Sequence, residues 1–178
     1  MTHHTVTAAE IASAIRNVPD FPKPGIQFKD ITPVLGDARL FAGAIDLLAA
    51  DFAPGSVDAV VGIDARGFIF AAAAALKLKA AFVPVRKKGK LPYHCHEESY
   101  DLEYGSNTVA LHTDAIRSGG RVILVDDLLA TGGTAGAALN LLKKVNANIV
   151  QVSFLIELAF LNGRSKLGNY PVKSIIVY

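Results

Sequence analysis

The 178-residue chain has a single cysteine, Cys95, and this scarcity limits the class of protein. One cysteine cannot form an internal disulfide framework, and a free thiol fits a reducing compartment. Excess charge is also missing, because 18 Lys and Arg residues nearly balance 16 Asp and Glu residues and leave a net charge of +2. A domain that binds nucleic acid is usually strongly basic, so the composition does not indicate nucleic acid as a partner.

Long hydrophobic segments are missing as well. The most apolar stretch, residues 68–76, ends before Lys77 and is far shorter than the roughly 20 residues that a membrane-spanning helix needs. The first residues show no long apolar region of the kind that a secretory signal contains. Hydrophobic residues still make up 51% of the chain, which is enough for a real core. We therefore expect one domain, residues 1–178, in a soluble cytoplasmic protein without a membrane partner.

Short apolar runs alternate with helical patterns along much of the chain. The spacing predicts helices at residues 7–17, 40–48, 67–79 and 134–145, and strands at residues 57–63, 80–85, 122–125, 149–156 and 172–177. Continuous apolar strands separated by helices are typical of α/β proteins, so we predict a mostly parallel central sheet flanked by helices. Residues 87–106 break the alternation with charged residues, and the length of this segment predicts a flexible functional loop.

The most informative segment, residues 122–134, joins a buried strand to a helix through two carboxylates and a Thr/Gly loop. Glycines let backbone N–H groups approach an anion, and the helix N-terminus adds the positive end of its dipole. The loop therefore predicts a phosphate site. Asp126 and Asp127 suit the task of accepting hydrogen bonds from sugar hydroxyls, and they could assist a magnesium ion. The predicted phosphate-binding residues are Ala130, Thr131, Gly132, Gly133 and Thr134.

A plainer interpretation is that paired acids merely end a strand and cap a helix, but the complete strand–acid–loop–helix string favours a binding site. The sequence contains no GxxxxGK[ST] P-loop, no GxGxxG dinucleotide fingerprint and no HExxH zinc motif. His94, Cys95 and His96 allow a structural metal site. Without further cysteines, this is the less favoured interpretation.

The 122–134 segment resembles the phosphoribosyl-pyrophosphate (PRPP) motif of the type I phosphoribosyltransferases. Its DLLATGGT form is similar to that of the adenine-using branch of this family. Further segments match the same branch in the same order and span nearly the whole chain. They are residues 21–31, 62–68, 86–92, 102–105 and 163–167.

The resemblance implies a purine-salvage enzyme that transfers the 5-phosphoribosyl group from PRPP to adenine and releases AMP and pyrophosphate. The reaction would be a displacement at C1′ through an oxocarbenium-like state, assisted by Mg²⁺. The ion would be held mainly by PRPP, without a dedicated protein site. The resemblance also implies a homodimer, and a turn after Asp64 that often contains a cis peptide in this family.

Residue roles follow from the same resemblance. Residues 130–134 would hold the 5′-phosphate, and Asp126 and Asp127 the ribose 2′- and 3′-hydroxyls. The implied pyrophosphate-binding residues are Arg66, Arg86, Lys87 and Lys90. The implied adenine-binding residues are Gln27, Phe28, Lys29 and Glu103, and Tyr104 would help to close the loop. The implied catalytic residues are Glu103, Arg66 and Lys90. Taken alone, the basic residues 86–90 could also be a solvated charge run.

Two other functions remain as alternatives. One is a related phosphoribosyltransferase that uses xanthine, hypoxanthine or guanine; the form of residues 128–134 and the segment 103–105 argue against it. The other is a PRPP-sensing regulator that binds DNA. Such a regulator needs a DNA-binding module and a basic face, and neither is visible in this sequence.

Overall fold

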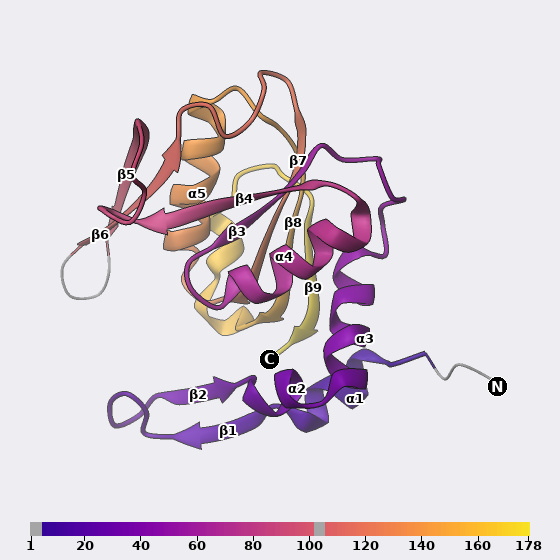
Figure 1. The fold of residues 1–178 in the computed structure, drawn as a ribbon. Helices are drawn as coiled ribbons and strands as arrows, with labels where there is room; N and C mark the ends of the chain where they lie inside the picture. The colour runs from indigo at the N-terminus through magenta and orange to yellow at the C-terminus, as the bar shows by residue number, and fades with distance from the viewer. Residues whose placement is uncertain (1–4, 102–105) are drawn as a thin grey trace. The chain divides into compact units, whose positions relative to one another are not determined.

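The computed structural model describes residues 5–101 and 106–178, and the chain groups into two compact units, Met1–Leu47 and Leu48–Tyr178. Figure 1 shows the helices and strands of both units. The N-terminal unit contains, in order, α1 (Ala8–Ala14), β1 (Arg16–Pro19), β2 (Gln27–Asp30), α2 (Thr32–Gly36) and all but the last two residues of α3 (Ala38–Ala49). None of the described helices is long and apolar enough to cross a membrane.

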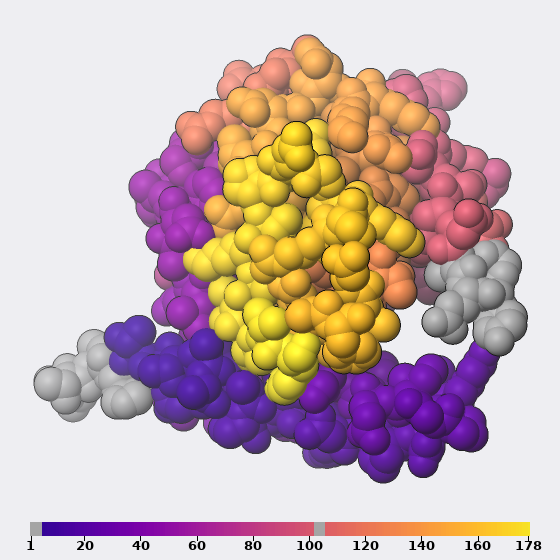
Figure 2. Space-filling view, turned by 180° about the vertical axis from the view of Figure 1, so that it is seen from behind, coloured from indigo at the N-terminus to yellow at the C-terminus, as the bar shows by residue number. Residues whose placement is uncertain are grey.

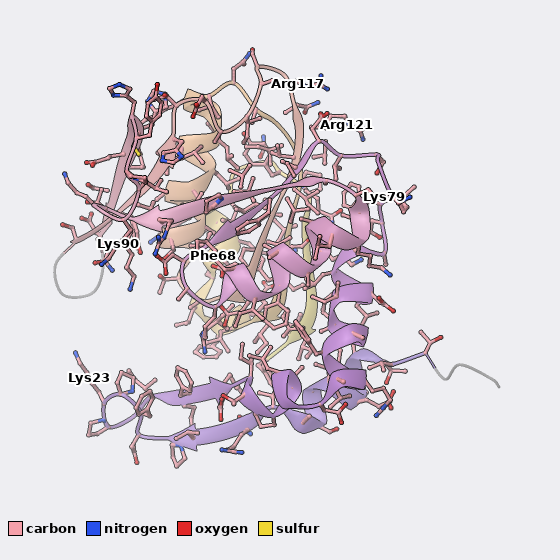
Figure 3. All side chains as sticks on the ribbon, viewed as in Figure 1. Lys23, Phe68, Lys79, Lys90, Arg117 and Arg121 are labelled. Carbon is pink, nitrogen blue, oxygen red and sulfur yellow. The ribbon has the colours of Figure 1, made fainter. Side chains whose placement is uncertain are left out.

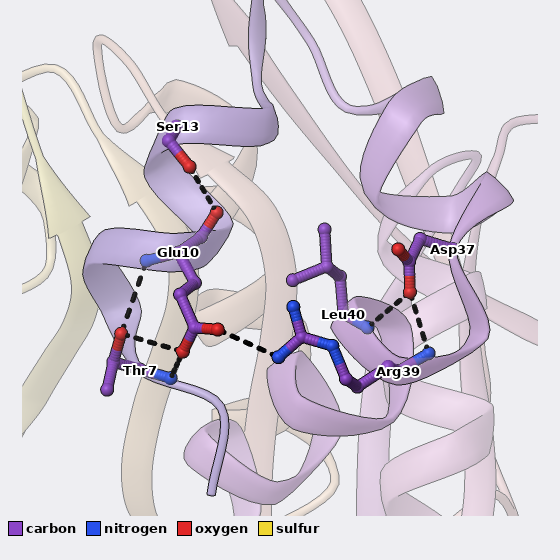
Figure 4. Close-up of polar contacts among 6 residues, drawn as sticks. All are labelled: Thr7, Glu10, Ser13, Asp37, Arg39 and Leu40. Carbon is purple, nitrogen blue, oxygen red and sulfur yellow. Dashed lines mark hydrogen bonds and ion pairs between the residues drawn. The ribbon is translucent and has the colours of Figure 1, made fainter. Parts of the chain in front are cut away.

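Helix α1 begins at a capping box. Thr7 Oγ1 accepts a hydrogen bond from the Glu10 N–H at 3.2 Å, and Glu10 Oε2 accepts one from the Thr7 N–H at 2.9 Å (Figure 4). The hydrogen bond from the Thr7 backbone, followed by that from Arg39, lowers the pKa of Glu10 to about 2. The helix ends at Ala14, earlier than predicted, because residues 16–19 instead pair with β2 as an antiparallel strand.

The larger unit is built on a seven-stranded sheet with the strand order β5-β6-β4-β3-β7-β8-β9. Strands β4, β3, β7, β8 and β9 are parallel, whereas β6 is antiparallel to β4 and β5 is antiparallel to β6. The elements of this unit are β3 (Ala59–Ile63), α4 (Gly67–Leu78), β4 (Ala81–Lys87), β5 (Cys95–Asp101), β6 (Ser106–His112), β7 (Arg121–Leu129), α5 (Gly133–Lys144), β8 (Asn148–Glu157), η1 (Ala159–Leu161), η2 (Gly163–Lys166) and β9 (Val172–Val177).

Helices cover both faces of this sheet, as the continuous apolar strands predicted (Figure 1). Ala59, Val61 and Ile63 of β3 share a core with buried residues of α5. Gly62, on the opposite face, lies directly against Ala71 of α4. Successive side chains of a strand point to opposite faces of the sheet. Since helices cover both faces, all five residues of β3 are buried. The predicted α/β fold with a mostly parallel sheet flanked by helices is therefore confirmed.

The loop expected at residues 87–106 contains a strand that the sequence pattern did not predict. Strand β5 lies at the edge of the sheet and carries polar side chains that contact α5. Lys144 Nζ lies 2.6 Å from Glu98 Oε2, and Asn140 Nδ2 donates to Glu98 Oε1 at 3.0 Å. Because these partners are remote in sequence, the strand lacks a local apolar signal. The flexibility of this segment stays a prediction, and residues 102–105 lie outside the described structure.

Candidate active site

The parallel strands bring three connections to the same edge of the sheet. Strands β3, β7 and β8 lie side by side and end at Ile63, Leu129 and Glu157, respectively. The segments that follow them are therefore neighbours, although they are far apart in the sequence. In open α/β sheets, ligands bind at this carboxyl edge.

The predicted phosphate-binding residues form one wall of a cavity at this edge. Gly132 has φ 77°, a left-handed conformation that favours glycine, and it is the N-cap of α5. The first turn of α5 follows immediately, and the Gly136 N–H donates to the Gly132 carbonyl at 2.9 Å. The cavity has a volume of about 80 Å³ and is lined by Asp126, Leu128, Leu129, Ala130, Thr131, Gly132, Gly133, Thr134 and Ala135.

Asp126 and Asp127 lie near the end of β7 and are both buried, with 9% and 6% of their surfaces exposed. The Asp127 N–H donates to Asp126 Oδ1 at 2.9 Å. Burial raises the pKa of Asp126, and the neighbouring Asp127 charge raises it further. Burial also raises the pKa of Asp127, although Arg66 opposes this shift. The pair is thus a concentrated acidic site that favours ligands with hydrogen-bond donors or positive charge.

Asp127 retains unused capacity for a ligand. Its Oδ2 atom is buried and makes no hydrogen bond of acceptable geometry with any described residue. Arg66 Nη2 lies 2.8 Å from this atom, so the contact is an ion pair without the alignment of a good hydrogen bond. A buried carboxylate oxygen in this condition can accept a hydrogen bond from a hydroxyl group of a bound molecule.

The turn after β3 places basic side chains beside the acids. The Asp64–Ala65 peptide is cis, as the resemblance implied. Arg66 is the N-cap of α4, and Arg86 Nε on the adjacent β4 lies 3.3 Å from Asp64 Oδ2. Arg86 Nη1 also donates to the Lys90 carbonyl at 3.2 Å. Among the predicted pyrophosphate-binding residues, Arg86 therefore contacts Lys90. It also contacts Asp64, in the turn that leads to Arg66.

Gly67 is a site residue to which the sequence pattern assigned no role. A Cβ atom at this position would overlap Oδ1 of Asp126, so only glycine lets α4 begin so close to the acid pair. The sequence offers one signal for this role: Gly67 directly follows Arg66 within residues 62–68, a segment that the sequence analysis used only for its resemblance to the family.

The predicted adenine-binding residues Gln27, Phe28 and Lys29 are consecutive on β2 of the N-terminal unit. Phe28 packs edge-on against Phe21, with a ring-centroid distance of 5.1 Å. Lys29 Nζ donates to Asn17 Oδ1 at 2.7 Å across the hairpin, so the Lys29 side chain is held against β1. The backbone role of Gln27 and Lys29 stays a prediction. Glu103 and Tyr104, the two other residues predicted to act on the base or loop, lie outside the described residues.

The region of His94, Cys95 and His96 is described at the start of β5. Cys95 Sγ contacts the Tyr93 carbonyl at 3.1 Å, and burial raises the pKa of the thiol. Across residues 5–101 and 106–178, the structure shows no group of three or more His, Cys, Asp or Glu side chains that could hold a metal ion. The structure therefore gives no support to the alternative of a structural metal site.

A glycine-rich loop, a helix N-terminus and paired carboxylates at the carboxyl edge of a parallel sheet define a class of protein that binds a phosphorylated sugar. A family model described as phosphoribosyl transferase domain matches residues 34–173. The chain belongs to this family, and within it to the adenine phosphoribosyltransferases, because curated members of that group are similar over almost their whole length. The adenine phosphoribosyltransferase of Acidothermus cellulolyticus is 56% identical over 166 residues, which are 93% of this chain and 94% of that protein.

Solved structures agree with this assignment. The adenine phosphoribosyltransferase of Thermoanaerobacter pseudethanolicus is 47% identical with a TM-score of 0.92, covering 97% of this chain and 100% of that one. The Saccharomyces cerevisiae enzyme is 43% identical with a TM-score of 0.89, covering 94% of this chain and 97% of that one. Its structure is a complex with adenine and D-2,5-dideoxy-2,5-imino-altritol 1,6-bisphosphate.

Proposed function

We propose that the chain transfers the 5-phosphoribosyl group from PRPP to adenine, forming AMP and pyrophosphate in purine salvage. The observation that carries this proposal is the buried Asp127 oxygen without a hydrogen bond, beside a phosphate loop at the carboxyl edge of the sheet. The yeast relative, whose structure contains adenine and a sugar-like bisphosphate, supports the choice of substrates.

PRPP binds through its 5′-phosphate to the loop at residues 130–134. Residues 130–134 surround this group with backbone N–H donors and threonine hydroxyls at the positive end of α5. The ribose 2′- and 3′-hydroxyls then donate to Asp126 and Asp127. One of these hydrogen bonds is accepted by Asp127 Oδ2, which accepts none from the described residues. Holding the ribose hydroxyls in this way orients C1′ for attack.

The pyrophosphate group leaves with several negative charges, and the basic residues neutralise them. Arg66 exchanges its contact with Asp127 for the pyrophosphate, and Arg86, Lys87 and Lys90 approach from β4 and the residues after it. Fixed positive charges stabilise the transition state because they act where the negative charge develops. The half-buried Arg86, held by Asp64, fits this role better than that of a solvated charge run.

Adenine lies against the face of Phe28, and the backbone of Gln27 and Lys29 contacts its edge. Glu103 hydrogen-bonds the base and helps to manage its N7 proton. Tyr104 closes the loop, which excludes water that would otherwise hydrolyse PRPP at the oxocarbenium-like stage.

Magnesium is best accommodated as a partner of the substrate. Asp126 and Asp127 are two carboxylates beside Arg66, and the described residues offer no third acidic or histidine ligand to complete a protein site. The phosphate oxygens of PRPP are hard ligands of the kind that Mg²⁺ prefers. When bound, the ion neutralises charge on the leaving pyrophosphate.

The active form is proposed to be a homodimer, built from both units as one domain. The family model covers residues 34–173, and the Acidothermus cellulolyticus relative is similar over 93% of the chain, which supports a single functional domain. Ile69 and Leu76 are exposed apolar residues seven positions apart on α4, and Phe82 on β4 is a third exposed apolar residue of the same unit. A second copy of the chain would cover such a surface. We expect the protein in the cytoplasm, with no nucleic acid or membrane as a partner.

Product formation tests the proposal directly. The purified chain is mixed with Mg²⁺, PRPP and, separately, adenine, hypoxanthine, guanine, xanthine or orotate. AMP from adenine alone is the expected result. Turnover of a different base would keep the mechanism and overturn the adenine assignment. Tight PRPP binding without any turnover would favour the regulator.

A further inference from the structure

A second acid–arginine pair lies beside the phosphate loop, at the end of β8. Glu157 is 5% exposed, and in the parallel register it is the partner of Leu129, the last residue of β7. Arg164 Nε donates to Glu157 Oε1 at 2.7 Å, and Arg164 Nη2 donates to Glu157 Oε2 at 2.6 Å. Two parallel charged hydrogen bonds of this kind fix the orientation of both side chains.

Arg164 belongs to η2, whose backbone presses against the phosphate loop. A Cβ atom on Gly132 would overlap the Gly163 carbonyl, and a Cβ atom on Gly163 would overlap the Ala130 carbonyl. A Cβ atom on Gly136, in the first turn of α5, would lie 3.3 Å from the Lys166 carbonyl. Figure 2 shows the gold segment that includes η2 against the orange segment that includes α5. The loop is therefore backed by the main chain of η2, without intervening side chains.

The Arg164 guanidinium also reaches the strand that follows η2. Its Nη1 donates to the Val172 carbonyl at 3.4 Å, and its Nη2 donates to Ser174 Oγ on β9 at 3.4 Å. These contacts are long, so the two bonds to Glu157 dominate. Arg164 thus connects η2 to β8, which precedes it in the chain, and to β9, which follows it.

We propose that Arg164 and Glu157 are positioning residues that hold η2 against residues 130–132 and thereby set the geometry of the loop that binds the 5′-phosphate. Neither residue needs to touch the substrate. That the loop binds a 5′-phosphate rests on the proposed function. That Arg164 and Glu157 hold the loop in place rests on the contacts of η2 alone.

Arg164→Lys is the test variant, because lysine keeps the charge but cannot form two parallel bonds to one carboxylate. Arg117→Lys is the matched control. Arg117 Nη2 lies 2.7 Å from Asp58 Oδ1 in an exposed ion pair, and Arg117 lies beside Arg121, away from Phe68 and the start of α4 (Figure 3). Titration calorimetry measures the affinities of both variants for ribose 5-phosphate and for pyrophosphate alone. Steady-state assays give kcat and the KM for PRPP.

We expect Arg164→Lys to weaken ribose 5-phosphate binding and to raise the KM for PRPP by roughly tenfold, because a displaced support moves the loop out of position. Its pyrophosphate affinity and kcat should stay within about twofold of the wild type, because Arg66 and Arg86 are carried by the start of α4 and by β4 rather than by the loop that η2 contacts. Arg117→Lys should change none of these values. Glu157→Gln, which keeps the shape of the acid, should reproduce the Arg164→Lys pattern more weakly.

Unchanged ribose 5-phosphate affinity in Arg164→Lys would overturn the proposal. An equal loss of ribose 5-phosphate and pyrophosphate binding would also overturn it, because that pattern indicates general damage. If neither Arg164→Lys nor Glu157→Gln folds, the pair supports the whole unit rather than the loop, and the proposal is again wrong. If the wild type makes no AMP but Arg164→Lys still selectively loses ribose 5-phosphate binding, the proposed function fails and the positioning role stands.

Discussion

Two buried acids beside the phosphate loop are each paired with an arginine, yet their pKa values move in opposite directions. Asp127 contacts Arg66 through one poorly aligned ion pair, and burial raises its pKa. Glu157 receives two well-formed hydrogen bonds from Arg164, and these lower its pKa in spite of burial. Two differences accompany the opposite shifts: Glu157 accepts two aligned hydrogen bonds from its arginine, whereas Asp127 accepts none at Oδ2 and lies beside a second buried acid, Asp126.

This contrast separates an acid with one oxygen that accepts no hydrogen bond from the described residues from an acid whose two oxygens both accept one. The charged form of Glu157 is satisfied within the protein, which suits a permanent support. Asp127 Oδ2 accepts no hydrogen bond from the described residues, which suits the proposed role of binding the ribose hydroxyls. Natural proteins often accept a local cost in stability at such functional positions. Four variants test how far the contrast holds.

The largest effect is expected from Asp127→Asn, which should lower kcat/KM for PRPP on the order of 100-fold. The charged acceptor for the ribose hydroxyl is lost, and hydrogen bonds to charged groups contribute about 1.5–3 kcal/mol each. Circular dichroism should show an intact fold. Asp58→Asn, which removes an exposed acid paired with Arg117, is the control and should keep wild-type kinetics. Wild-type kinetics in Asp127→Asn would remove the acid pair from the substrate site.

Arg66→Lys sharpens the comparison, because it makes the same chemical change as Arg164→Lys on the other pair. We expect it to weaken pyrophosphate binding by roughly tenfold, since lysine cannot contact two phosphate oxygens through a planar group. Ribose 5-phosphate affinity should change little. Calorimetry with the two ligands separately gives the answer, and a variant that loses both affinities equally would contradict the assignment of Arg66 to the leaving group.

Glu157→Gln should lower the free energy of unfolding by about 1 kcal/mol at neutral pH, because one charged bond to Arg164 is weakened. The pKa of Glu157 is lowered in the folded state, so its charge stabilises the fold above the ordinary pKa of glutamate. This contribution is lost as the pH falls through the lowered value. Urea unfolding from pH 7 to pH 3 should therefore show the difference from wild type shrinking with acidification; a constant difference would mean that charge is not its origin.

Asp126→Asn should change stability by about as much as Glu157→Gln does, with the opposite sign. The pKa of Asp126 is raised by burial and by Asp127, so ionisation destabilises the folded state increasingly as the pH rises above the ordinary range of aspartate. Asparagine removes this cost and should raise the free energy of unfolding by about 1 kcal/mol at neutral pH, or the Tm by roughly 2–4 °C. The gain should vanish near pH 4. A lower Tm at pH 7 would show that Asp126 is stabilising as a charged group.

Local sequence patterns predicted the centre of this protein well. Strands β3, β4, β7, β8 and β9 and helices α4 and α5 lie close to where the spacing placed them, because a buried strand needs a continuous apolar sequence. Strand β6, with its short buried run at residues 109–111, was not predicted. The phosphate loop was also predicted correctly as the connection between a buried strand and a helix, since residues 122–134 are contiguous. The edge strand β5 was missed because its polar side chains pair with α5, about 40 residues further along the chain.

Sequence by itself thus determined the strand–loop–helix connection at residues 122–134, the position of the acid pair within it and the family, because each depends on neighbouring residues or on ordered motifs. Only the tertiary structure decided that Gly67 admits the Asp126 carboxylate and that η2 backs the loop. The same holds for the opposite pKa shifts of Asp127 and Glu157. These properties depend on burial and on partners supplied by other strands and turns, and the order of residues along the chain does not encode them locally.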